Sequence, residues 1–124
     1  MSTQDNKLIK LVTKLIRLTI ANHVKWELSD VPRNLTEGTD DIISTYLSTE
    51  YMDKEFALFV RKYQQYSGEF DTMYWTQEIK LAIIENDEVI WENKQPIPSL
   101  VDLLDHAQSQ VSGLNDFIDK FLED

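Results

Sequence analysis

Acidic residues are the first candidates for chemistry in this sequence, because carboxylate oxygens are the ligands that calcium and magnesium ions prefer. They gather at residues 40–41, at Glu69 with Asp71, and along residues 85–88. None of these groups has the Asp-x-Asp-x-Asp-Gly spacing of a calcium loop. We therefore expect turn acids there, and no metal site.

Zinc binding and covalent catalysis need other residue types, which are few. His23 and His106 lie far apart, and neither has a second imidazole three or four positions away. Cysteine is absent, and Ser67 stands outside any nucleophile-elbow pattern. The three glycines are scattered, so no glycine-rich phosphate loop forms. The sequence predicts no catalytic residue, no cofactor and no enzymatic activity.

The alternation of two predicted strands creates a candidate interaction surface. Tyr, Phe and Arg are enriched in protein–protein contacts, and the strand period of two places several of them on one face. The predicted surface consists of Phe59, Arg61, Tyr63, Tyr74, Glu78 and Lys80. Ordinary cross-strand pairing on a solvated face is the alternative.

The elements that must position this surface follow from hydrophobic periodicity. Residues 4–22 form a predicted amphipathic helix, and alternating apolar residues predict strands at 24–28, 55–63 and 73–84. A strand at 42–51 competes with a helix capped by Thr39, and a short strand follows the polar turn at residues 85–88. A last helix runs from its N-cap, Ser99, to the end of the chain.

Several side chains are assigned to the core by these patterns. Gly113, inside the last helix, indicates either a close approach to the sheet or a bend. The residues expected to face the core are Val24, Trp26 and Leu28 in the first strand, Trp75, Ile79, Leu81 and Ile83 in the fourth, and Leu103, Leu104, Val111, Leu114 and Phe121 in the last helix.

Together these elements predict a single α+β domain over residues 1–124. Short turns between consecutive strands favour an antiparallel meander of about five strands, with the N- and C-terminal helices packed on one face. The length of 124 residues fits one domain, and 42% hydrophobic residues suffice for a core.

Charge and composition limit the partners. The net charge of −10 argues against a nucleic-acid-binding surface, which needs clustered Lys and Arg. Lys7, Lys10, Lys14 and Arg17 interrupt the N-terminal apolar residues, so we expect neither a signal peptide nor a membrane span. The lack of cysteine fits a cytoplasmic protein.

The chain resembles a family of small, functionally uncharacterised bacterial α+β proteins of similar length. The resemblance rests on segments 56–66, 74–75, 89–92, 100–104 and 113–117, and the chain departs from it at residues 85–88, where such proteins have a glycine. It implies a stand-alone bacterial domain and transfers no site residue.

We therefore expect a non-catalytic cytoplasmic protein-interaction domain that binds a protein partner or itself. It would act through the aromatic and Arg-containing sheet face or through its acidic surface. One alternative is an immunity or inhibitor protein that blocks a basic, nuclease-type cleft. Another is a small-ligand-binding module.

Overall fold

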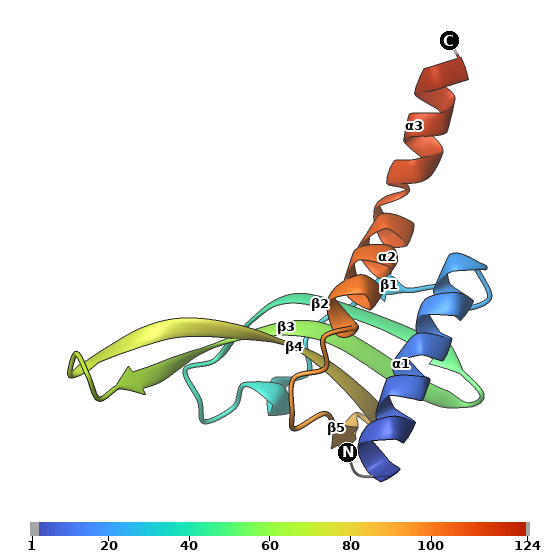
Figure 1. The fold of residues 1–124 in the computed structure, drawn as a ribbon. Coiled ribbons are helices and arrows are strands. Elements are labelled where there is room, and N and C mark those ends of the chain that lie inside the picture. Colours follow the sequence, from blue (N-terminus) through green and yellow to red (C-terminus); the bar gives the residue numbers. More distant parts are fainter. Residues whose placement is uncertain (1–2, 124) are drawn as a thin grey trace.

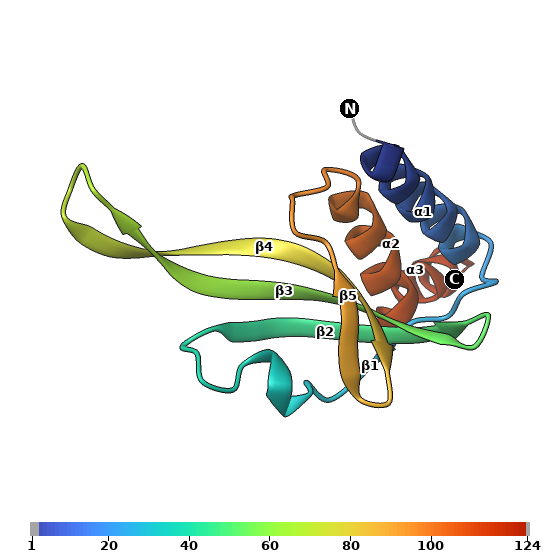
Figure 2. The same cartoon turned by 90° about the horizontal axis from the view of Figure 1, so that it is seen from below.

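The computed structural model describes residues 3–123 and shows one open sheet with helices on one face (Figures 1 and 2). All neighbouring strands are antiparallel in the order β1-β2-β3-β4-β5, which confirms the predicted α+β meander. The elements are α1 Thr3–Ile20, β1 Glu27–Leu28, the 3-10 helix η1 Arg33–Leu35, β2 Ile42–Tyr51, β3 Lys54–Ser67, β4 Thr72–Glu85, β5 Glu88–Glu92, α2 Leu100–Ser112 and α3 Leu114–Glu123.

Two tight turns explain how the meander reverses within so few residues. Asn86 and Asp87 join β4 to β5 with φ angles of 55° and 63°, and Met52 and Asp53 join β2 to β3 with 54° and 63°. Two consecutive positive φ angles define the hairpin turn that matches strand twist. Asn and Asp tolerate this conformation, so the predicted reversal at residues 85–88 is confirmed.

The core beneath the helices follows the predicted alternation. Phe56, Leu58 and Val60 of β3 pair with Ile83, Leu81 and Ile79 of β4, so all six lie on the same face. The helices contribute fully buried side chains to the same cluster, among them Val12 and Leu15 of α1 and Leu100, Leu103 and Ala107 of α2.

A second, smaller core lies on the opposite face of the sheet, which the sequence had suggested was open. The loop between β1 and β2, with η1, lies below the sheet, on the side away from α1 and α2 (Figure 1). Leu35 of η1 packs beside Tyr46 and Phe59, whose rings stack 5.6 Å apart. The side-chain amide of Asn34 donates to the Asp87 carbonyl at 3.2 Å, which ties the loop to the β4–β5 turn.

The first strand is shorter than predicted because a helix side chain replaces its sheet partner. Gln110 accepts a hydrogen bond from the backbone N–H of Trp26 at 2.6 Å and donates to the Val24 carbonyl at 2.8 Å. Both apolar residues are buried as expected. Leu28 is 72% exposed, so its assignment to the core was wrong.

The predicted last helix is divided at Gly113, which has a left-handed φ of 64°. A Cβ at this position would meet nothing within 4 Å, so the glycine serves the bend and not a close approach. Beyond it, α3 projects away from the sheet (Figure 1). Leu114 and Phe121 are exposed, so the expectation that they belong to the core was wrong.

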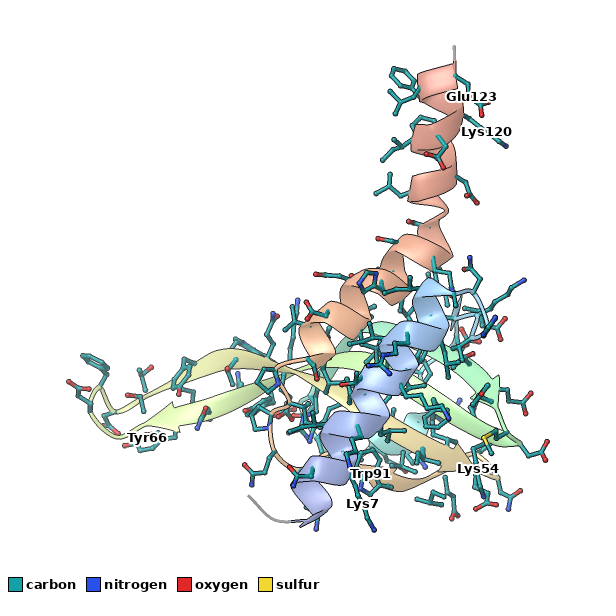
Figure 3. The ribbon with its side chains drawn as sticks, turned by 45° about the vertical axis from the view of Figure 1, so that its right-hand side comes forward. Lys7, Lys54, Tyr66, Trp91, Lys120 and Glu123 are labelled. Carbon is teal, nitrogen blue, oxygen red and sulfur yellow. The ribbon has the colours of Figure 1, made fainter. Side chains whose placement is uncertain are left out.

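The distal part of the β3–β4 hairpin also projects from the body. Pairing with β2 ends at Lys62, and residues 63–76 continue as a two-stranded segment that we call the ribbon (Figure 3, with Tyr66 near its tip). Trp75 lies on the helix-bearing side of this segment but is half exposed, because none of the helices in the described part of the chain covers it. No helix in residues 3–123 is long and apolar enough to cross a membrane.

Candidate functional site

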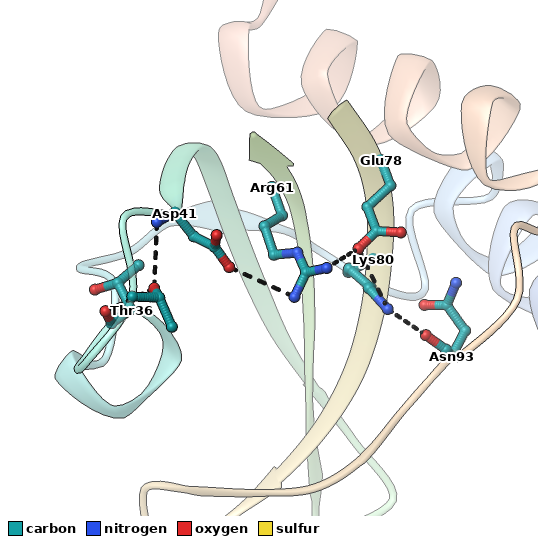
Figure 4. A network of polar contacts seen from close by, with 7 residues as sticks. Thr36, Asp41, Arg61, Glu78, Lys80 and Asn93 are labelled. Carbon is teal, nitrogen blue, oxygen red and sulfur yellow. Dashed lines mark hydrogen bonds and ion pairs between the residues drawn. The ribbon is translucent and has the colours of Figure 1, made fainter. Parts of the chain in front are cut away.

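The outer sheet face carries a connected group of charged side chains (Figure 4). Arg61 and Glu78 are cross-strand partners, and Nη2 lies 2.7 Å from Oε1. The other terminal nitrogen of Arg61, Nη1, lies 3.6 Å from Oδ2 of Asp41, at the end of the covering loop. Arg61 also stands over the Tyr63 ring, 4.8 Å from its centre.

The group continues into the protein at Lys80, which is only 5% exposed. Its Nζ lies 3.5 Å from Glu78 Oε1 and donates to the Asn93 carbonyl at 2.6 Å. The side-chain oxygen of Asn93 accepts from the Leu81 N–H at 2.8 Å. Asn93 thus bonds to β4 just beyond the end of β5. Its carbonyl oxygen holds the buried ammonium of Lys80 in place.

These contacts are held by the attraction of opposite charges more than by well-aligned hydrogen bonds. Glu78 Oε1 and Arg61 Nε are buried and have no well-aligned hydrogen bond. The cluster contains Asp41, Arg61, Glu78 and Lys80, so its formal charge is zero. We infer a structural role, because it holds the covering loop to the sheet while its charges compensate one another.

The structure places all six predicted surface residues on one face but leaves only some accessible. Phe59 is 1% exposed beneath Leu35 and Tyr46, and Lys80 is buried beside Asn93. These two therefore cannot contact a partner in this structure. Arg61, Tyr63, Tyr74 and Glu78 retain accessible surface, and Tyr74 is the most exposed of them at 44%.

The ribbon exposes more apolar surface than the sequence indicated. Its large exposed side chains are between 44% and 73% accessible: Tyr66, Phe70, Met73, Tyr74 and Trp75. Strand alternation divides the ribbon side chains between two sides. Tyr74 lies on the outer side, together with the less exposed Tyr63, whereas Tyr66, Met73 and Trp75 lie on the helix-bearing side. Isolated exposed apolar residues are common, whereas here several of them are concentrated on one projecting element.

Two grooves adjoin the sheet without completing a recognisable reactive centre. One, of about 730 Å³, lies beside Arg61 and Phe59 and is bordered by Trp91 and Lys94. Another, of about 660 Å³, lies between the start of α1 and the Pro96–Pro98 segment. Within the described residues, no three His, Cys, Asp or Glu side chains gather as metal ligands.

Sequence reasoning missed Asp41 and Asn93 as members of the charged cluster. Both lie outside the predicted strands, in segments without hydrophobic periodicity. The one available signal was Lys80, which was expected on the outer face. Its ammonium is buried in the structure, and a buried charge needs polar partners.

Comparison with known proteins does not classify the chain. It matches no family model, and no curated protein or solved structure is significantly similar to it. The resemblance to small bacterial proteins therefore stays a prediction.

An acidic region occupies the end of the sheet near the β2–β3 turn. Burial raises the pKa of Glu55 above its ordinary value of 4.5, and repulsion from Asp87, Glu50 and Glu27 raises it further. Burial, with a contribution from Glu55, raises the pKa of the neighbouring Tyr46 to about 12. Ionised Glu55 therefore weakens the folded state.

The buried cluster yields a paired prediction. Glu78→Ala removes the carboxylate between Lys80 and Arg61, and we expect it to lower the free energy of unfolding by about 2–3 kcal/mol. Lys80→Met keeps the Arg61–Glu78 pair and fills the same space, so the change should stay within about 1 kcal/mol. Urea denaturation measures both losses, and the comparison holds if the two variants have the same m-value. Equal losses in both variants would contradict the role of Glu78 as the carboxylate that Arg61 and Lys80 share.

Glu55 yields a prediction about pH. Because its folded-state pKa is raised, stability should fall as the pH rises from about 4.5 through that pKa. Glu55→Gln should therefore stabilise the protein at pH 7, by roughly 0.5 kcal/mol because Glu55 is only partly buried. The gain should vanish below about pH 4. Thermal unfolding across pH, with the exposed loop variant Glu37→Gln as control, measures this; a gain that persists in acid would contradict it.

Proposed function

We propose that this chain is a non-catalytic, cytoplasmic protein-interaction domain that binds a partner through the outer side of its ribbon. The observation that carries the proposal is the placement of Tyr63 and Tyr74 on an uncovered side of a projecting two-stranded element. Tyrosine combines a large apolar ring with a hydrogen-bonding hydroxyl, which suits a surface that must be both soluble and adhesive.

Free strand edges on the ribbon support the same proposal. After Lys62, β3 has no β2 partner, and β5 pairs with β4 only from Ala82 onward. An extended segment of a partner can hydrogen-bond to such an edge while its side chains contact the tyrosines. Arg61 and Glu78, at the base of the ribbon, provide polar groups at the border of this surface.

A second candidate, an immunity or inhibitor protein for a basic nuclease-type cleft, is favoured by the acidic region. The repulsion that Glu27, Glu50 and Asp87 exert on Glu55 would be relieved by a cationic partner. That surface lies at the opposite end of the hairpin from the ribbon tip, so the two candidates predict different contact residues.

Site-specific photo-crosslinking in the native cells tests the proposal. A photoreactive residue in place of Tyr74 should capture a defined partner, and the matched probe at exposed Glu50 of β2 should not. Purified wild-type protein should compete for this capture, whereas Tyr63→Ala/Tyr74→Ala should compete roughly tenfold less well or worse. Capture at position 50 alone would favour the acidic region instead, and an equally competitive double variant would contradict the tyrosine surface.

A further inference from the structure

The amphipathic helix α3 has an apolar stripe that nothing covers within the described chain. Its members are 41% to 74% exposed: Leu114, Phe117, Ile118, Phe121 and Leu122. They recur at spacings of three and four residues and so form one side of the helix. Asp116, Asp119 and Glu123 lie on the opposite side, which leaves the stripe free of charge.

In the sequence, this stripe continues the helical spacing of the apolar residues with which α2 enters the core. Leu103, Leu104 and Ala107 of α2 are buried in the core beneath the helices, and Val111 is partly buried at its margin. The helix-bearing side of the sheet also continues, through Met73 and Trp75, onto the ribbon. Each chain therefore carries an apolar helix side, on α3, and an apolar sheet side, on the ribbon, that both extend beyond its own core.

Within one copy the two extensions diverge and do not cover each other. The ribbon leaves the body in one direction and α3 rises from the sheet in another (Figure 1). Figure 3 shows Tyr66 at the far end of one projection and Glu123 at the far end of the other. A second copy is the one partner that is certain to present both surfaces.

We propose that the chain forms a twofold-symmetric dimer in which the α3 stripe of each copy packs on the helix-bearing side of the other copy's ribbon, at Tyr66, Met73 and Trp75. The packing repeats the α2-on-sheet contact of the monomer core. Twofold symmetry makes each contact twice, which is the commonest way for a soluble chain to close an assembly.

The available area fits such a dimer. If a large apolar side chain presents about 150–200 Å² of surface, the exposed parts of the stripe and of the ribbon side amount to roughly 500 Å² and 300 Å². Two such contacts bury on the order of 1,600 Å², the size of a standard stable interface. A contact between two α3 stripes alone would bury about 1,000 Å², near the lower limit.

The dimer is independent of the proposed function, because Tyr63 and Tyr74 lie on the other side of the ribbon. Sedimentation over a wide range of concentrations should show a monomer–dimer equilibrium for the wild type. Phe117→Ser/Phe121→Ser and Tyr66→Ser/Trp75→Ser should each weaken it by roughly tenfold or more. Val101→Ser, at an equally exposed apolar position on α2, should not change it.

Cysteine cross-linking distinguishes the proposed packing from its alternatives, since the chain has no cysteine of its own. An equal mixture of Phe121→Cys and Tyr66→Cys chains, treated with a bismaleimide, should give dimers that contain one chain of each kind. A wild type that is monomeric at every concentration would overturn the proposal, as would cross-linking of Phe121→Cys chains only to one another. Loss of the dimer with unchanged photo-crosslinking at position 74 would leave the proposed function intact.

Discussion

The structure depends on the uninterrupted pairing of β3 with β4. Thirteen consecutive residue pairs, from Glu55 with Ile84 to Ser67 with Thr72, keep one register without a bulge. Because a slip of one residue would turn every side chain to the opposite face, this register fixes both cores and both sides of the ribbon. The flanking pairings are irregular, with shifts at residues 43–45 in β2 and at residues 89–91 in β5, so the central hairpin sets the geometry.

Coverage of this hairpin is unequal, so its residues divide into a buried group and an accessible group. Its inner half is covered on both faces, by α1 and α2 on one and by the η1 loop on the other. The Lys80 ammonium is buried there and needs polar partners, which are the Glu78 carboxylate and the Asn93 carbonyl oxygen. Within residues 3–123 the outer half has no cover, and the same alternation that builds the core leaves Tyr63 and Tyr74 on one side and Tyr66, Met73 and Trp75 on the other.

Sequence periodicity predicted the strands, their turns and the helix-bearing core, because an apolar period of two or 3.6 residues identifies the side that faces the core. It does not show whether a partner element reaches that side. Trp75, Leu114 and Phe121 were therefore placed in the core although they lie beyond the elements that could cover them. Phe59 was wrongly expected to be accessible, because the covering loop has no periodic signal and its contacts with Tyr46 and Asp87 depend on tertiary structure. Lys80 was wrongly expected to be accessible for a similar reason, since Asn93 lies beyond the periodic part of β5. Four of the six proposed surface residues retain accessible surface.

One continuous hairpin is thus half core and half free surface. Native-state hydrogen exchange measures it directly, because amide protection follows the free energy of local opening. In dilute monomeric protein, we expect the amides of residues 56–60 and 79–83 to exchange only by global unfolding. The amides of the ribbon and of α3 should exchange orders of magnitude faster and gain protection as the concentration rises. Uniform protection along both strands in a demonstrated monomer would contradict the account.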